Sequence, residues 1–494
     1  SKKRITCKEE NKMRCIIRNI HDRDGITDEI LSQLEKKFAL ERAIVLDVEK
    51  SEKRDEKLEY KPLRLAMCHN CIEFLEMEGD IPRFILEGML PYKAMAMHML
   101  MRESHYDIYS FHYLEQVYYR HVKYWNNLLE KERIDFLLYL VTPHHAGEYI
   151  LYALAKVRKI PTALFAPITP IGHFVSGTSI ENVGYTIEKI YKEGITERKL
   201  GEDFSAFVDR VDNASTFTAK EKKAVQLDTK KAVFSYNSSM QFWRRLLKVP
   251  YIKFSPKYKN HRDFYLQEQC RLTKLTWDTI RYERKMDHLA DYEKIAVEPD
   301  WNEKFIYFSL QQTPEETTMP RAGEYKNQML SIETLACAAS ALGLKVYVKE
   351  HWVQPHREPG FYKELSEIPG VTLINLEVPA AELIHYAIAV STQTGTCILE
   401  AMLMQKCTLY FGEGQPFKGA PGAIKVDDSK QAQKVIADIL NKTISVSKRE
   451  AMNYMQAMEQ ACICSYVDSL SETTRQYDKK ETAKKIVAFI QTLA

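Results

Sequence analysis

The sequence predicts an α/β protein made of two doubly wound domains, and three observations lead to that prediction. The chain has 494 residues, more than one hydrophobic core usually serves. Short apolar runs rich in β-branched residues alternate with helical stretches near both ends of the chain. With 45% hydrophobic and 28% charged residues, the composition excludes a disordered, collagenous or low-complexity chain.

Bulk properties also narrow the class of function. A net charge of +3 is too small to indicate a nucleic-acid partner. No apolar run approaches the ~18 residues that a membrane span needs, and the first residues lack the apolar core of a signal peptide, so we expect a cytoplasmic protein. The ten cysteines form no regular framework, which predicts reduced thiols. Cys68 and Cys71 have metal-ligand spacing, but no second pair follows at zinc-ribbon distance, so no metal is assigned.

The first domain is expected to span residues 1–199. "AIVLDV" (43–48) and "IDFLLYLV" (134–141) read as buried strands, and the aromatic, Met-rich stretch 72–130 between them reads as helices that fill the core. The segment 142–167 then gives a polar loop, a helix and a strand, which completes a βαβ unit.

Three ionisable side chains follow the strand at 134–141. Because open α/β sheets bind ligands beyond the carboxyl ends of their strands, His144, His145 and Glu148 are candidates to deprotonate an acceptor or to act as a nucleophile. The alternative for Glu148 is a place in the first turn of a helix, where it complements the dipole. Asp107 and Asp135 are weaker candidates.

Residues 200–298 lose the strand pattern and predict a helical insertion or bridge. Within it, 242–262 interleaves aromatic and basic residues with no acid. We expect this stretch to bind an anionic acceptor or a membrane surface through Arg244, Arg245 and Lys248; the alternative is a solvated basic face.

The second domain, 299–428, is the most regular part. Its expected strands are "KFIYFSL", "LKVYVKE", "VTLINL", "IAVST" and "CTLYFG", each separated from the next by a helical stretch or a turn. The tail, 429–494, reads as helices that pack back across the cleft. Two Rossmann-like domains facing a cleft, with a helical insertion and a C-terminal helical tail, describe the GT-B architecture of nucleotide-sugar glycosyltransferases.

Three polar loops end strands of the second domain: "QQTPEETT" (311–318), "KEH" (349–351) and "STQTGT" (391–396). The last precedes a helix, so its free N–H groups and the helix dipole are expected to face a phosphate; the alternative is a tight connection with no ligand. Alternation along a strand sends Lys349 and His351 to one side and Glu350 to the other. The first two would then add charge and a proton donor to a leaving phosphate, unless the cluster is a surface salt bridge.

These segments also resemble a known family. "YFSLQQTPEETTMP", "YKNQMLSIETLA", "LKVYVKEHW" and "LIHYAIAVSTQTGTCILEAMLMQKCTLYFG" resemble the capsular polysaccharide biosynthesis family, the bacterial surface-glycan proteins that include the capsule Kdo transferases. The resemblance covers the second domain. It implies a GT-B glycosyltransferase that uses a nucleotide-activated sugar, often CMP-linked, to build a cell-surface polysaccharide.

The resemblance assigns roles residue by residue. The family's Gln-Pro-Glu element looks like Gln312, Pro314 and Glu315, its Lys-Glu-His-Pro element matches 349–351, and its Thr-Gly-Thr and Glu-Ala elements match 394–396 and 400–401. Trp352 replaces the proline of the second element, and Gln405, Lys406 and Cys407 stand in place of Gly-Lys-Pro. With the rest of the loop, the implied donor-binding residues are Gln312, Glu315, Lys349, Glu350, Ser391, Thr392, Thr394, Gly395, Thr396 and Glu400, and His351 is the implied catalytic group at the phosphate.

The leading functional prediction is a glycosyltransferase that moves a sugar, favoured as CMP-linked such as CMP-Kdo, to a cell-surface polysaccharide or glycolipid. The alternatives are a GT-B-shaped nucleotide-sugar epimerase and a catalytically silent subunit of a polysaccharide assembly complex, which the Trp352 and Gln405 departures suggest. Expected partners are the nucleotide sugar, a glycan or lipid-linked acceptor, and the inner face of the membrane. No cofactor, metal or nucleic acid is expected.

Overall fold

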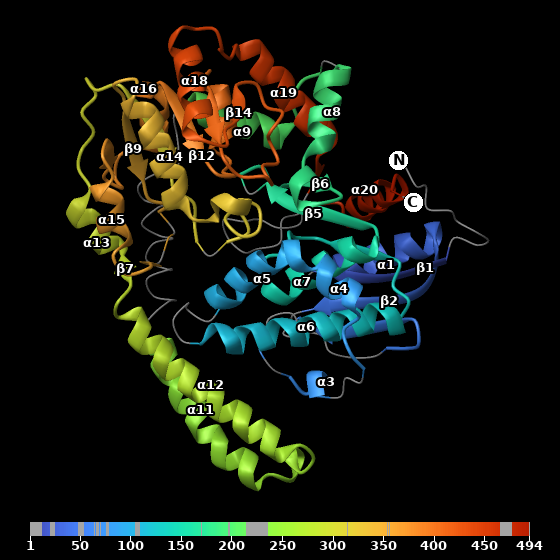
Figure 1. Ribbon diagram of the computed structural model, residues 1–494. Coiled ribbons are helices and arrows are strands. Elements are labelled where there is room, and N and C mark those ends of the chain that lie inside the picture. Colours follow the sequence, from blue (N-terminus) through green and yellow to red (C-terminus); the bar gives the residue numbers. More distant parts are fainter. Residues whose placement is uncertain are drawn as a thin grey trace.

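The computed structural model describes residues 12–19, 25–47, 54–63, 65, 69, 71–75, 79–103, 109–168, 170–195, 198–213, 236–313, 315–352, 354, 356–464 and 477–493. Two β-sheets covered by helices make up the body, and a long helical hairpin projects from it (Figure 1). Pro314, Asp107 and Cys68, which the sequence singled out, lie outside the described residues.

The first sheet has seven strands in the order β15-β6-β5-β4-β1-β2-β3. Strands β1 to β5 are parallel, whereas β6 and β15 run antiparallel to their neighbours. The strands are β1 (Lys12–Arg18), β2 (Ala39–Asp47), β3 (Leu58–Pro62), β4 (Phe136–Tyr139), β5 (Thr162–Ile168), β6 (His173–Gly177) and β15 (Ile463–Cys464).

Both faces of this sheet are buried, and side chains along each strand alternate between two cores. Ile16 of β1 belongs to the core under the helices between β3 and β5, whereas Cys15 and Ile17 belong to the core under α1 and the C-terminal α20. The helices on this sheet are α1 (Ile26–Lys37), α3 (Ile72–Leu75), α4 (Arg83–Gly88), α5 (Leu90–Glu103), α6 (Phe111–Lys131), α7 (Ala146–Arg158), the 3-10 helix η1 (Ile180–Asn182), α8 (Tyr185–Glu193) and α9 (Glu202–Asp212).

The second sheet has six parallel strands in the order β11-β9-β8-β12-β13-β14. Its strands and a separate two-stranded ribbon are β8 (Phe305–Ser309), β9 (Lys345–Lys349), β11 (Val371–Leu373), β12 (Ala389–Thr392), β13 (Thr408–Tyr410) and β14 (Ala423–Lys425), with β7 (Asp287–His288) paired to β10 (His356–Arg357). The strand order reverses between β8 and β12, the topological switch point at which doubly wound sheets bind ligands.

Helices cover both faces of the second sheet, and its strands again alternate between two cores. Ile306 and Phe308 face one core, while Phe305 and Tyr307 face the other. The helices are α13 (Leu289–Ile295), η3 (Gly323–Lys326), α14 (Gln328–Ser340), α15 (Phe361–Glu367), α16 (Ala380–Tyr386), α17 (Cys397–Leu403) and α18 (Ser429–Leu440). The doubly wound, GT-B-like fold class predicted from the sequence is therefore confirmed.

The two domains touch closely. Gly184, at the start of α8, adopts φ +84° and lies so near the backbone of Pro416 that an added Cβ would be 2.0 Å from the Pro416 carbonyl oxygen. Lys418 adds a hydrogen bond of 3.1 Å to the carbonyl oxygen of Glu181. The seam between the domains is therefore a packed interface at this end.

The C-terminal segment returns to the first domain. α19 (Lys448–Ala461) packs against α8, β15 extends the first sheet beside β6, and α20 (Lys479–Gln491) packs on α1. α11 (Tyr236–Phe254) and α12 (Arg262–Glu283), joined through η2 (Pro256–Tyr258), form the hairpin. α9, in the stretch expected to be an insertion, instead packs its apolar face into a hydrophobic core that residues of both domains share, and it contacts α17 of the second domain.

Candidate functional site

The three loops that the sequence singled out meet at the switch point of the second sheet. The Oε1 of Gln311, just after β8, accepts a hydrogen bond of 3.2 Å from the Thr394 N–H after β12. The Thr394 hydroxyl donates to the Thr317 carbonyl oxygen at 2.7 Å, and Arg357 donates to the Gln311 carbonyl oxygen at 2.9 Å. The convergence is thus built from direct hydrogen bonds between loops.

Two glutamines that the sequence analysis did not single out fix the first loop. Gln328, at the start of α14, accepts from the Gln311 N–H at 2.7 Å and donates to its carbonyl oxygen at 2.9 Å. Gln354 makes the same paired contacts with the backbone of Thr313, at 2.8 Å and 2.7 Å. Both side chains are buried, so each replaces a partner that the backbone would otherwise lack. The loop is held in one conformation.

The "KEH" strand end divides as predicted, with Lys349 and Glu350 on opposite faces of the sheet. The Lys349 ammonium donates to the Val378 carbonyl oxygen, next to one core. Glu350 points into the other, where Arg357 donates to it from Nε at 2.7 Å and from Nη2 at 2.6 Å, and the Tyr362 hydroxyl donates at 2.9 Å. Both side chains thus have structural contacts within the domain, and their contacts with a donor stay a prediction.

His351 follows Glu350 directly in the chain and is partly buried. Its N–H donates to Glu350 at 2.6 Å, and its ring lies over Trp352 with centroids 6.2 Å apart. Burial lowers the pKa of His351 to about 4, with the Glu350 carboxylate opposing the shift and the Arg357 guanidinium reinforcing it. A neutral imidazole at neutral pH can still donate one hydrogen bond to a phosphate oxygen.

More backbone N–H groups of the turn 391–396 already have hydrogen-bond partners than the sequence suggested. Ser391, Thr392 and Thr394 are buried, and the Gly395 N–H donates to the Thr392 hydroxyl at 3.2 Å. Because the Thr394 N–H is also taken, two of the amides expected to face a phosphate already have partners. Gly395 and Thr396 remain partly exposed and are the part of the turn that a ligand can reach.

Glu400 lies one turn further on, in α17. Burial raises the pKa of its carboxyl group, and only the charge of Arg210, on α9 of the first domain, opposes the shift. Within the described chain its carboxylate accepts no hydrogen bond. The residue is partly exposed while its carboxyl group is buried without a hydrogen-bond partner among the described residues, which fits the predicted role of receiving ligand hydroxyl groups.

In the first domain, Glu148 is fully engaged. Its Oε1 lies 2.7 Å from Arg18 Nε at the end of β1, and its Oε2 accepts from the N–H groups of His144 and His145, both at 3.3 Å. The Arg18 guanidinium and the two histidines lower the pKa of this carboxyl against the opposing effect of its burial, the largest single influence. The contacts agree with the helix-turn alternative and leave Glu148 poorly placed as a base, whereas both imidazoles stay partly exposed. Asp135 precedes β4, so it lies at the opposite edge of the sheet.

The carboxyl of Glu315, in the second domain, is influenced by charges of the first domain. Burial and the neighbouring Glu316 raise the pKa of its carboxyl, while the charges of His144 and Arg102 lower it. Arg102, near the end of α5, is buried; its Nη2 donates to the His144 carbonyl oxygen and its Nη1 has no partner within the described residues. Sequence reasoning missed Arg102, although an arginine ending a buried Met-rich helix was a usable signal.

The three residues expected to bind the acceptor lie on the hairpin but differ in their contacts. Arg244 and Lys248 are exposed on α11, and no ion pair holds either of them within the described chain. Arg245 instead joins the two helices: its Nη1 donates to the Leu272 carbonyl oxygen at 3.0 Å and to the Thr276 hydroxyl at 2.5 Å. Arg245 therefore has a structural role in joining the two helices, and its contact with an acceptor stays a prediction.

No known protein-family model matches the chain, and no curated protein is similar to it in sequence. Solved structures similar to it include the UDP-GlcNAc 2-epimerase of Methanocaldococcus jannaschii (10% identity, 97% of this chain and 99% of that chain, TM-score 0.25). A β-Kdo 2,7-transferase structure of KpsC from Thermosulfurimonas dismutans (12%, 74% and 88%, 0.29) and the calicheamicin glycosyltransferase CalG4 (13%, 98% and 99%, 0.25) are also similar.

The capsule Kdo transferases that the sequence motifs resemble are thus among these structures. At such identities and TM-scores the comparison bears on neither substrate nor chemistry, which have to come from the residues of the site. Among the described helices, none combines the length and apolar character needed to cross a membrane.

Proposed function

We propose that the chain is a glycosyltransferase that binds a nucleotide-activated sugar, CMP-linked such as CMP-Kdo, at the switch point of the second sheet and transfers the sugar to an acceptor on the first domain. The carrying observation is the hydrogen-bonded convergence of the loops after β8, β9 and β12, where the charges of His144 and Arg102 of the other domain lower the pKa of the Glu315 carboxyl. Such a site would hold the donor in a fixed orientation and leave a separate surface for the acceptor.

The roles follow from the contacts. His351, neutral at physiological pH, donates to the oxygen of the leaving phosphate, where charge grows in the transition state. Glu400 accepts hydroxyl groups of the donor, because its buried carboxyl lacks a partner in the described chain. On the acceptor side, His144 or His145 takes the proton, since Glu148 is held by Arg18.

A hydrogen-exchange experiment tests the donor site. With saturating CMP, UDP and GDP in parallel, we expect one nucleotide to protect 311–317 and 395–400 and to leave 142–150 unchanged. Protection confined to 142–150 would contradict the assignment. Product analysis then tests the reaction: transfer needs the acceptor, whereas an epimerase alters the free nucleotide sugar without one, and a silent subunit consumes none.

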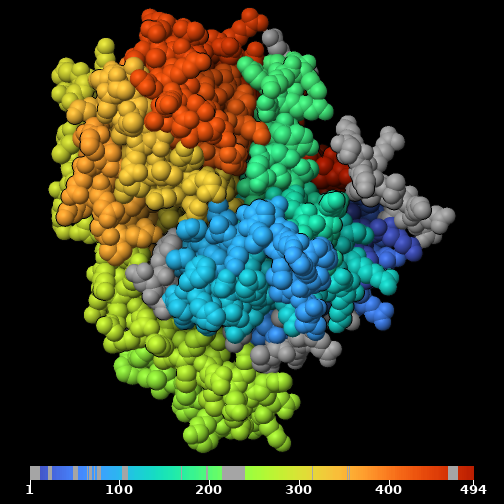
Figure 2. Space-filling model, in the orientation of Figure 1, coloured from blue at the N-terminus to red at the C-terminus, as the bar shows by residue number. Residues whose placement is uncertain are grey.

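The hairpin supports an acceptor at a membrane surface. One side of α11 exposes four large apolar side chains spaced at helical intervals, Trp243, Leu247, Tyr251 and Phe254. Arg244 and Lys248 stand beside them, and the hairpin forms a lobe below both domains (Figure 2). An exposed apolar face bordered by basic residues suits the interface of an anionic bilayer, where a lipid-linked acceptor would lie.

Vesicle sedimentation tests this surface. Each basic residue near an anionic membrane contributes about 1 kcal/mol, so replacing Arg244 and Lys248 with Gln should weaken binding to phosphatidylserine vesicles roughly 30-fold at low salt. Replacing Lys430 and Lys434, two exposed lysines on α18, with Gln is the matched control. If both double variants bound the vesicles equally well, the alternative interpretation of 242–262 as a solvated basic face would hold.

A further inference from the structure

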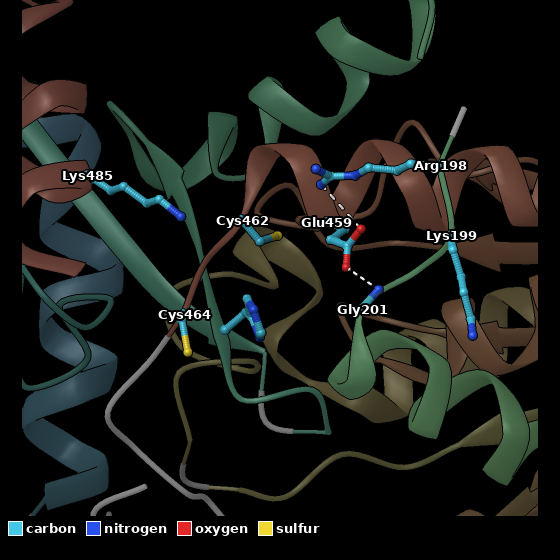
Figure 3. Close-up of a pocket in the computed structure, with 8 residues that line it drawn as sticks. Arg198, Lys199, Gly201, Glu459, Cys462, Cys464 and Lys485 are labelled. Atoms are coloured by element: carbon cyan, nitrogen blue, oxygen red, sulfur yellow. Dashed lines mark hydrogen bonds and ion pairs between the residues drawn. The ribbon is translucent and has the colours of Figure 1, made fainter. Parts of the chain in front are cut away.

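A cavity of about 350 Å³ lies where the C-terminal segment rejoins the first sheet, apart from the loops of the donor site. His173 of β6 and Cys464 of β15 line it, together with Arg198, Lys199 and Lys485. Figure 3 shows Cys464 and Lys485 on one side of the cavity and Arg198, Lys199 and Glu459 on the other.

Strand pairing sets two of these side chains against each other. β15 runs antiparallel to β6, and Cys464 is the residue directly opposite His173. Directly opposed residues of an antiparallel pair project to the same face, with Cβ atoms about 4.5–5.5 Å apart. The close approach of thiol and imidazole is therefore fixed by the register of the sheet.

A carboxylate completes the group. Asp203 lies in the first turn of α9, and one ligand atom from each of His173, Asp203 and Cys464 lies within 4.8 Å of the other two. Phe204, the next residue of α9, packs edge-on against the His173 ring with centroids 5.0 Å apart. Three elements far apart in the sequence thus deliver sulfur, nitrogen and oxygen to one point.

The imidazole is oriented as a metal ligand requires. Its Nδ1 lies 3.2 Å from the Ile171 carbonyl oxygen, which can only accept, so Nδ1 carries a hydrogen, and in the neutral imidazole Nε2 is then the atom with the lone pair. Histidines that bind metals almost always donate their other ring N–H to a carbonyl or carboxylate in this way.

We propose that His173, Asp203 and Cys464 bind a zinc-class divalent ion. A thiolate with an imidazole selects zinc over magnesium or calcium, and three protein ligands leave the fourth tetrahedral position open to the cavity. Ligand atoms around zinc lie about 3.5 Å apart, so the three groups close by about 1 Å on binding. This site is separate from the donor loops and independent of the proposed transferase activity.

The surroundings indicate what fills the open position. The one nearby acid lining the cavity, Glu459, is occupied: Arg198 lies 3.2 Å from it and the Gly201 N–H donates to it at 2.6 Å. Lys199 and Lys485 add two further positive charges at the cavity. The fourth ligand is therefore a water or a small anion. The metal would tie β15 to β6 and to α9, which fixes the returning C-terminal segment.

Metal content and cobalt spectroscopy test the site on the full chain. The purified protein should hold one zinc per chain after dialysis, and Co²⁺ should produce the near-ultraviolet charge-transfer band of a cobalt–thiolate bond. Cys464→Ser should abolish the band, while Cys270→Ser, which alters an exposed thiol on α12, should keep it. A wild-type protein that binds no stoichiometric zinc, or a band that survives in Cys464→Ser, would overturn the proposal.

Two further measurements apply if Cys464→Ser fails to fold. Asp203→Asn should weaken Co²⁺ binding roughly 100-fold, since loss of an outer-shell partner alone already costs 10–100-fold. Stripping the wild-type protein with a chelator should lower its melting temperature by several degrees, and zinc alone should restore it. An unchanged Co²⁺ affinity in Asp203→Asn, or a melting temperature indifferent to the chelator, would count against the site.

Discussion

Replacing Glu350 with Gln tests whether this residue holds the donor loops or contacts the donor. The carboxylate accepts four hydrogen bonds, two from Arg357, one from the Tyr362 hydroxyl and one from the His351 N–H. Side-chain exposure is 0% for Glu350 and 2% for Arg357, so water cannot replace a lost partner. Breaking a buried pair by removing one charge costs about 3–5 kcal/mol.

The measurement is unfolding of the full chain by urea and by heat, followed by circular dichroism. A loss of about 3–5 kcal/mol in a domain of this size lowers its melting temperature by roughly 12–20 °C. Glu364→Gln, an exposed carboxylate on α15, is the matched control and should stay within about 0.5 kcal/mol of the wild type.

A double variant sharpens the test. Glu350→Gln with Arg357→Met removes both charges, and a neutral pair should recover part of the stability that Glu350→Gln loses. If Glu350→Gln unfolds within about 1 kcal/mol of the wild type, or the double variant loses the sum of the two single effects, the ion pair does not hold the loops. Glu350 would then return to the predicted donor-contact role.

Three other outcomes are expected. His351→Ala should lower kcat on the confirmed donor by roughly 100-fold, because a donor aimed at developing charge is worth about 3 kcal/mol, while the urea midpoint stays near that of the wild type; wild-type turnover would make the histidine structural. The pKa of His351 lies near 4 when folded and near 6.5 when unfolded, so the unfolded chain binds the extra proton between these pH values and stability should fall as pH drops through that window. His351→Gln should flatten that slope, and an unchanged slope would show that other groups titrate there. Nucleotide affinity measured by calorimetry should be the same with and without a chelator, since no Asp-x-Asp pair follows a strand of the second domain; affinity restored only by Mg²⁺ or Mn²⁺ would refute this.

Strands with unbroken apolar runs were predictable, and those that carry charge were not. The run at 304–310 reads directly as β8, because its apolar residues 305–308 are all buried on a two-sided sheet. β1 was missed because Arg14 and Arg18 interrupt its apolar residues. Their partners, Glu41 and Glu148, lie on other elements, so nothing local shows that these arginines belong in a sheet.

The same limit applied to the site. Strand-end loops could be placed at one edge from topology alone, and the alternation that separates Lys349 from Glu350 followed from the pleat. The partner of each polar group could not be derived in this way. Arg357 reaches Glu350 only after a tight turn, and Arg245 reaches Thr276 on the facing helix of the hairpin. Both pairs depend on tertiary geometry.

Three cationic side chains at strand ends of the second domain have partners within that domain. Their pairing affects how the charge of a bound phosphate would be neutralised. Lys349 donates to the Val378 carbonyl oxygen, Arg357 is paired with Glu350, and Arg321 with Glu316 at 3.1 Å. These three charges are paired within the second domain, so a phosphate bound there would be met by hydrogen bonds more than by free positive charge. Arg102, whose Nη1 has no partner in the described chain, comes from the opposite domain. Charge that develops on a leaving phosphate would thus be met most fully when both domains contact the ligand, which couples chemistry to the seam between them.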